Sequence, residues 1–173
     1  MPLLTPELTT GNVEVGDATG WSVREGAVAL LNTAALLPNG FKHRTESSTR
    51  GLEADIPEGV GIVGRARGAF NVNPQAPCGL VDNRYSFYVA VVRSSQKGLD
   101  GSRPGERQSD AWLEGAARLF NGNRPNLALP SGCCVISSAV VDNDPRFLPA
   151  WLKQLDAVYL LVNVVVREVM PRA

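Results

Sequence analysis

The segment from Ala157 to Val169 restricts the possible folds more than any other part of the chain. It is nearly all aliphatic or β-branched, which is typical of a β-strand. Neighbouring side chains of a strand point to opposite faces of its sheet. Both faces are apolar here, with Val158, Leu160, Val162, Val164 and Val166 on one and Tyr159, Leu161 and Val165 on the other. The segment therefore predicts a strand that is covered on both sides, at the centre of a sheet or against a partner.

Three further segments have the pattern of strands. The clearest is Arg84 to Arg93, and Cys133 to Asp142 is another. The segment Val60 to Val72 predicts a weaker strand, because glycines interrupt its apolar residues. In the clearest strand, one face carries Tyr85, Phe87, Val89 and Val91, and the other carries Ser86, Tyr88, Ala90 and Val92.

Two segments have helical periodicity. In Ser22 to Leu37 the apolar residues recur at helical spacing, Ser22 and Glu25 have the spacing of a capping box, and Pro38-Asn39-Gly40 ends the run. The second segment, Glu106 to Phe120, is amphipathic and ends at Asn121-Gly122-Asn123. A segment from Pro149 to Leu155 predicts one or two helical turns, whereas no element is predicted for the polar stretch from Lys42 to Glu58.

The order helix, strand, strand, helix, strand, strand predicts an α+β fold, with two helices packed on one face of a mostly antiparallel sheet of four to five strands. Residues 1–20, rich in glycine and proline, predict an extended N-terminal arm, and residues 21–173 predict a single domain. The residues expected to be largely buried are Leu30, Leu31, Phe87, Val89, Trp112, Leu119, Leu160 and Val162.

Charge and length exclude several classes of protein. The 17 basic residues balance the 17 acidic ones, which disfavours general attraction to nucleic acid or to anionic membranes. The longest apolar runs, Ala27 to Leu37 and Ala157 to Val166, are shorter than the roughly 20 residues that cross a bilayer. Residues Met1 to Thr10 lack the basic and apolar regions of a secretory signal, so we expect a protein made and kept in the cytoplasm.

One motif suggests a nucleotide site on first reading. Residues Gly59 to Gly64 match the G-x-G-x-x-G pattern of dinucleotide-binding proteins. That pattern needs an apolar strand before the glycines and a helix after them, so that the helix N-terminus meets the pyrophosphate. Here Glu53 to Glu58 precede the glycines and Arg65-Ala66-Arg67-Gly68 follows them. We therefore expect no nucleotide cofactor.

His43 is the only histidine, and it lies between Lys42 and Arg44. Such a residue is most often a solvated loop residue. A Cys-His dyad with Cys78 or Cys133 stays open, although no nucleophile signature surrounds either cysteine. The cysteines have neither the C-x-x-C spacing of a zinc site nor the even number of a disulfide framework, and adjacent Cys133 and Cys134 would face opposite sides of a strand.

The carboxylates of Asp142 and Asp144 could indicate a cation site, but no loop glycine or bidentate glutamate follows at the required spacing. An Asx turn before Pro145 explains the same residues. The basic residues Arg65, Arg67, Lys97, Arg103, Arg107 and Arg124 are spread over several segments, which is typical of a solvated surface. The sequence thus assigns no catalytic, cofactor-binding or metal-binding residue, and a small hydrolase or transferase and a monomeric ligand-binding module remain alternatives.

The order and length of these elements resemble the tail terminator (tail completion, minor tail) proteins of long-tailed phages. The resemblance covers most of residues 22–169. It rests on the helix Ser22 to Leu37, the strands around Val60 to Phe70 and Tyr85 to Val92, the helix with Asp110-Ala111-Trp112-Leu113, and the ending from Asp144-Pro145-Arg146-Phe147 through Tyr159 to Val169. The arm at 1–20 and the proline-containing stretch at 74–77 are not features of that pattern, and they leave another head-to-tail connector, a stopper or adaptor, as an alternative.

The resemblance implies a structural virion protein without active-site residues, assembled in the host cytoplasm and located in the neck or tail. It implies a homo-hexameric ring that sits on the tail tube protein, stops its growth and contacts a head-tail connector protein, with DNA passing through the channel. In such a ring, we expect the loop Ser94 to Gly105, with Lys97 and Arg103, to project toward the channel or a neighbouring ring.

Sheet edges support an assembly independently of the resemblance. A sheet of four or five strands has two edges with unpaired backbone groups, which soluble proteins cover, charge or pair. The last strand is also apolar on both faces, although two helices on one side cover only one of them. A second subunit is the simplest cover for the remaining surface.

Overall fold

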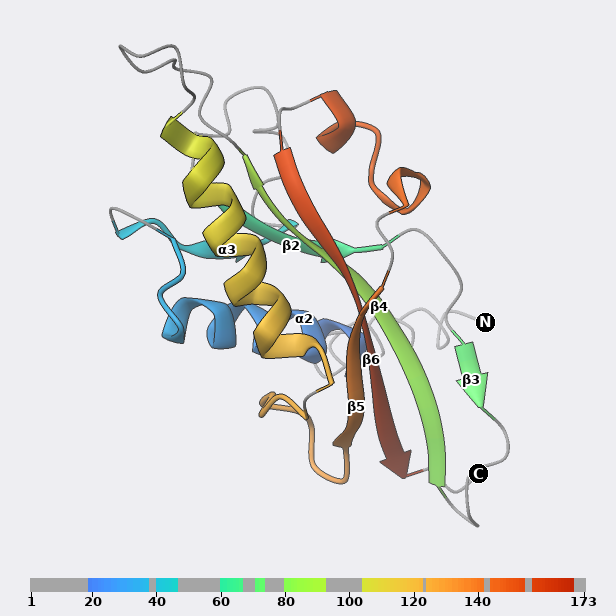
Figure 1. Cartoon of the computed structure of the whole chain (residues 1–173). Helices are drawn as coiled ribbons and strands as arrows, with labels where there is room; N and C mark the ends of the chain where they lie inside the picture. Colours follow the sequence, from blue (N-terminus) through green and yellow to red (C-terminus); the bar gives the residue numbers. More distant parts are fainter. Residues whose placement is uncertain are drawn as a thin grey trace, which may run out of the picture.

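Two long strands, β4 (Leu80–Val92) and β6 (Ala157–Val169), pair antiparallel along their whole length and form the centre of a sheet (Figure 1). The computed structural model describes residues 19–37, 40–46, 60–66, 71–73, 80–92, 104–122, 124–141, 144–154 and 157–169. Within these ranges, the strand predicted over Ala157 to Val169 is confirmed with the same ends.

Four shorter strands complete the sheet. On one side of the central pair, β5 (Cys134–Val141) runs antiparallel to β6. On the other side, β2 (Gly61–Arg65) pairs antiparallel with one half of β4, and β3 (Asn71–Asn73) pairs with the other half. The short β1 (His43–Thr45) forms that edge and runs parallel to β2. Five strands therefore lie side by side in the order β1-β2-β4-β6-β5, and β3 continues the line of β2.

Two helices, α2 (Thr19–Thr33) and α3 (Pro104–Phe120), cover one face of this sheet, which we call the helix-covered face. Helix α3 connects β4 to β5, so the chain skips the position that β6 later fills. The apolar side chains of the helices and those of the strands share one core. Its fully buried members include Val23, Leu31, Val63, Phe87, Val89, Trp112, Phe120, Val162 and Val164.

The other face, which we call the second face, is covered in part by the segment between β5 and β6. This segment contains two short 3-10 helices, η5 (Pro145–Phe147) and η6 (Leu152–Gln154). Its side chains Leu148 and Leu152 form a second apolar cluster with the sheet residues Val60, Ile62, Ala66, Tyr88, Ala90 and Leu161. Figure 1 shows these two turns across the long strands from α3.

The structure confirms the predicted α+β fold of two helices on one face of a mostly antiparallel sheet. The predicted core residues are buried, except that Leu30 and Leu119 are half-buried against the core. Pro149 to Leu155 was predicted to form one or two turns and contains η6. The predicted strand from Val60 to Val72 overlaps two strands, β2 and β3, and the glycines Gly61 and Gly64 lie inside β2 rather than interrupting it.

Both predicted helix starts were too late. Helix α2 begins at Thr19, so Ser22 lies inside the helix rather than at its N-cap, and the predicted arm loses its last two residues. Residues 1–18 lie outside the described part of the chain. Helix α3 begins at Pro104, because proline is well suited to the first turn, where its missing N–H leaves no bond unmade.

The first helix also ends earlier than predicted. The Ala34 N–H donates to Leu30 O at 3.0 Å in the last turn of the helix. The next residue, Ala35, has a left-handed φ of 50°. This turn redirects the chain, so that Leu37 packs into the core after the helix has ended. The apolar periodicity included Leu37 because this side chain is buried in the core, although it is not helical.

The expectation that a second subunit is the simplest cover for the other face of β6 is corrected in part. The segment 144–154 covers the half of the second face that contains Tyr88, Ala90 and Leu161. Toward the Val169 end of β6, exposed residues remain on this face. The sequence prediction missed this cover because a segment with two single-turn helices has no periodicity to detect.

This packing predicts unequal effects for two neighbouring substitutions. Leu152 is 2% exposed on the second face, whereas Lys153 beside it is exposed. Leu152→Ala should lower the free energy of unfolding by about 2–5 kcal/mol, because it leaves a cavity against the sheet. Lys153→Ala should change it by less than about 0.5 kcal/mol. Urea unfolding followed by circular dichroism measures both, and a small effect of Leu152→Ala would contradict the described cover.

Candidate functional site

A buried polar residue, His43, lies at the start of the edge strand β1. Its ring Nε2 accepts a hydrogen bond from the Trp112 indole Nε1–H of α3 at 2.9 Å. The two rings are stacked, with an interplanar angle of 21°. Its main-chain N–H donates to the Asn32 side-chain oxygen of α2 at 2.7 Å, and its main-chain oxygen accepts from the Asn32 amide nitrogen at 3.0 Å. We call His43, Asn32 and Trp112 the His43 clasp, because together they connect β1 to both helices.

The environment of His43 corrects the expectation of a solvated loop residue. The side chain is only 3% exposed. Burial lowers the pKa of the imidazole from its ordinary value of 6.5 to about 4. The ring is therefore neutral at pH 7, and its Nε2 is occupied as an acceptor.

The motif residues Gly61 and Gly64 lie in a strand. They belong to β2, where a dinucleotide-binding loop would have to turn into a helix. Each glycine makes room for a neighbouring side chain. A Cβ atom on Gly61 would overlap the His43 ring, and one on Gly64 would overlap the Tyr88 hydroxyl and the Glu46 carboxylate. The spacing that resembles a nucleotide motif is thus explained by close packing on both faces of β2.

A second polar group lies around Gly64. The Tyr88 side chain is fully buried, and burial followed by the nearby Glu46 carboxylate raises the pKa of its hydroxyl well above the usual range. Trp151, between η5 and η6, donates its indole N–H to Glu46 at 3.4 Å. On the side of α2, Arg24 lies with its guanidinium carbon 5.6 Å from the centre of the Trp21 ring. Burial and then the positive charge of Arg65 lower the pKa of Arg24, while Glu46 opposes this shift.

A third polar group lies where the long strands extend beyond the helices. Tyr85 of β4 donates to Glu168 of β6, and burial and this carboxylate raise the pKa of Tyr85. Thr19, at the first position of α2, lies with its hydroxyl oxygen 3.9 Å from the Cys133 sulfur. Burial raises the pKa of the Cys133 thiol, which is the opposite of the shift that activates a nucleophilic cysteine.

The described candidate residues His43 and Cys133 have different neighbours, because His43 contacts Trp112 and Gly61 whereas Cys133 lies beside Thr19. Cys133 is half-buried and Cys134 exposed, and both are free. Cys78, Asp142, Lys97, Arg103 and Arg67 lie outside the described residues. The predicted Asx turn is confirmed, because the Asp144 side chain accepts from the Arg146 N–H at 2.9 Å. Hydrogen bonds from Arg146 also hold the pKa of Asp144 below its usual range.

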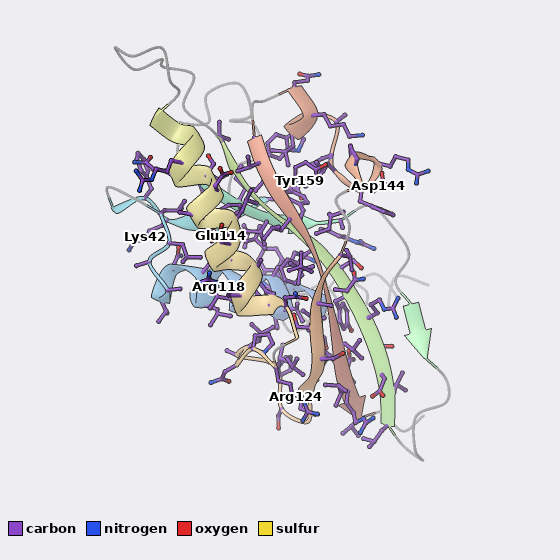
Figure 2. All side chains as sticks on the ribbon, in the orientation of Figure 1. Lys42, Glu114, Arg118, Arg124, Asp144 and Tyr159 are labelled. Atoms are coloured by element: carbon purple, nitrogen blue, oxygen red, sulfur yellow. The ribbon has the colours of Figure 1, made fainter. Side chains whose placement is uncertain are left out.

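The charged side chains of the described residues are dispersed over the molecule. Figure 2 shows Lys42, Arg124 and Asp144 on separate parts of the molecule, with Glu114 and Arg118 along α3. Glu114 and Arg118 form an ion pair at 3.7 Å within that helix. Arg65 and Arg107 are exposed on β2 and α3. In the part of the chain that the structure describes, no three metal-ligating side chains come close enough to hold an ion.

Three of the described side-chain hydrogen bonds join elements that are distant in sequence: Trp112 to His43, Trp151 to Glu46 and Tyr85 to Glu168. A nucleophile needs a base that is free to take its proton, and the His43 nitrogen already accepts from an indole that does not titrate in water. Among the described residues, the contacts of His43 therefore connect β1 to α2 and α3.

The sequence contains a signal for these contacts that periodicity does not reveal. Single glycines inside a strand often mark a close approach of another group. A buried tryptophan also needs an acceptor for its indole N–H. Combining Gly61 with Trp112 would have favoured a buried His43, although neither signal identifies the partner.

None of the described helices is long and apolar enough to span a membrane. No protein-family model matches the chain, and no curated protein sequence matches it.

The contact between Gly61 and His43 can be measured by a double-mutant cycle. Gly61→Ala should destabilise the fold by about 1–3 kcal/mol, because its Cβ would overlap the His43 ring. In a His43→Ala background, the same change should cost clearly less, since the ring is gone. Urea unfolding of the four proteins gives the coupling energy, and equal costs in both backgrounds would contradict the described packing.

The His43 clasp also predicts how stability depends on pH. Because the folded-state pKa lies below the ordinary value, the neutral ring contributes stability above about pH 6.5, and this contribution is lost as the pH falls toward 4. Between about pH 7 and about pH 4.5, wild type should lose roughly 2–3 kcal/mol more than His43→Gln, which cannot be protonated there. Equal losses in urea unfolding would contradict the described environment of the ring.

Proposed function

We propose that this chain is a structural protein of the phage neck and tail, which forms a ring that terminates the tail tube and joins the tail to the head. The resemblance in element order supports this class of protein. The fold is compatible with it, because two helices lie on one face of the sheet and the other face is only partly covered.

The observation that carries the proposal is the uncovered part of the second face. Figure 1 shows the ends of β4, β5 and β6 continuing past both helices. At this end, the second face exposes Arg84 of β4 and Cys134, Ser137 and Ala139 of β5. These β5 side chains are small, so the surface can approach another subunit closely. We call these four residues the open face.

The free edge at β5 is less suitable for an assembly contact than the open face. The Gly122 N–H, just after α3, donates to the main-chain oxygen of Ser138 at 3.0 Å. The strand also has a register shift at Ile136, where it carries one residue more than β6 opposite. Proteins use such irregularities to prevent edge-to-edge pairing of sheets. This favours a contact through the face of the sheet over the strand addition that unpaired edges alone suggest.

A ring requires that the open face meets a different surface of the next subunit. Repeating such a head-to-tail contact around an axis closes a ring, whereas a contact of the open face with itself stops at a dimer. The six-fold symmetry, the tail tube protein, the head-tail connector protein and DNA in the channel come from the resemblance. Lys97 and Arg103 remain proposed for the channel or the inter-ring loop.

Two matched substitutions test the proposal. Ala139→Arg places a long charged side chain on the open face, and Ala111→Arg places the same side chain on the exposed surface of α3. Both sites are exposed, so each variant should unfold within about 0.5 kcal/mol of wild type. Light scattering and electron microscopy, with and without tail tubes, should show six-fold rings for wild type and Ala111→Arg, and subunits near the chain mass of 18.5 kDa for Ala139→Arg.

Wild-type protein that stays monomeric and does not cap tail tubes would contradict the proposal. Rings that bind the head-tail connector but leave tube length unchanged would favour the stopper or adaptor alternative. Rings that persist in Ala139→Arg would place the contact elsewhere on the molecule.

A further inference from the structure

The His43 clasp contains a hydrogen bond that one proton can disrupt. The indole of Trp112 only donates, so His43 Nε2 must be an unprotonated acceptor. A proton on Nε2 would direct two N–H donors at each other across 2.9 Å. The ring cannot keep this position once it is protonated, because it would be a buried cation with no acceptor at that nitrogen.

No described charge compensates such a cation. The elements packed against the ring present an amide from α2, an indole from α3 and a glycine from β2. Burial is the sole cause of the shift in the pKa of His43. The flanking residues Lys42 and Arg44 are themselves basic. The described charged side chains of the neighbouring elements are exposed, apart from half-buried Arg24 of α2, Arg44 of β1 and Glu46 directly after β1. The Glu46 carboxylate lies beside Tyr88 and Trp151. The exposed charged side chains are Glu25, Arg65, Arg107, Asp110, Glu114 and Arg118.

The strand that His43 belongs to is weakly held by the sheet itself. Strand β1 has three residues and, among the described strands, pairs only with β2 and lies at the edge. The hydrogen bond from the Gly61 N–H to Lys42 O is long, at 3.4 Å. Such short edge elements can open locally while the core remains folded. The clasp therefore supplies much of the attachment of β1, through Asn32 and Trp112.

We propose that the His43 clasp is an acid-operated latch: protonation of His43 releases β1 from β2 and α3 and opens this edge of β2, while the β4–β6 core stays folded. The reaction is a simple protonation, in which a proton from solvent binds Nε2 and the indole N–H loses its acceptor. The device does not depend on the proposed function. It gives the molecule a second, acid-populated state with a free strand edge.

The presence of one histidine makes the test direct, because a single imidazole signal reports the protonation. Hydrogen exchange by mass spectrometry, corrected for the intrinsic rate at each pH, should be compared for peptides covering residues 41–46, β4 and β6. Between about pH 7 and about pH 4.5, the opening of 41–46 should increase on the order of 10- to 100-fold. In the same samples, the β4 and β6 peptides should stay protected.

The control variant is His43→Gln, whose side-chain oxygen accepts a hydrogen bond but takes up no proton in this range. Its 41–46 peptide should show no such increase. If this variant does not fold, an NMR titration of wild type replaces it, and the His43 ring signal and the Trp112 indole N–H signal should shift with one common midpoint. The proposal is overturned if 41–46 keeps its protection, if β4 and β6 lose theirs together with 41–46, or if the two NMR signals titrate independently.

Discussion

The antiparallel pairing of β4 with β6 is the interaction on which the rest of the structure depends. It runs in register from Leu80 opposite Val169 to Val92 opposite Ala157. Each face of this strand pair contributes to one apolar cluster. Phe87 and Val162 pack in the cluster on the helix-covered face, and Tyr88 and Leu161 pack in the cluster on the second face. Because burial of each such side chain contributes about 1.5–3 kcal/mol, this pair of strands anchors both layers that pack on it.

The sequence predicted those parts of the fold whose side chains repeat with a regular period. The alternation along β4 and β6 indicated both strands and the side chains on each face, and the spacing around Trp112 indicated α3. Elements without a period were missed or misplaced. Strand β1 has three residues, His43 to Thr45, all polar, and it forms because Asn32 and Trp112 bind it rather than because of its own composition. Trp112 lies 69 residues after His43, so the local sequence pattern around His43 cannot identify it as a partner.

The polar contacts also could not be predicted from the local sequence. Lys42 and Arg44 suggested that His43 is solvated, but the environment of a side chain is set by what packs over it. Gly61 and Gly64 match a nucleotide-binding motif in residue type and spacing. In the sheet, the absence of a side chain at Gly61 leaves space for the His43 ring, and its absence at Gly64 leaves space for the Tyr88 hydroxyl. The residue types could indicate close packing, but the partners can be identified only from the register of β1, β2 and β4, which the local sequence pattern does not reveal.

The order of strands in the sheet has a consequence for how the chain acquires its structure during synthesis. Strand β6 lies between β4 and β5, yet it follows both in the sequence. As the ribosome extends the chain, β4 and β5 emerge without the strand that joins them, and α2 and α3 have only part of their packing surface. Contacts of such long sequence separation form slowly, because a large loop must close before they can form. Folding of this core must therefore wait until β6 has left the exit tunnel, and until then the apolar faces of the earlier strands are available to chaperones or to neighbouring nascent chains.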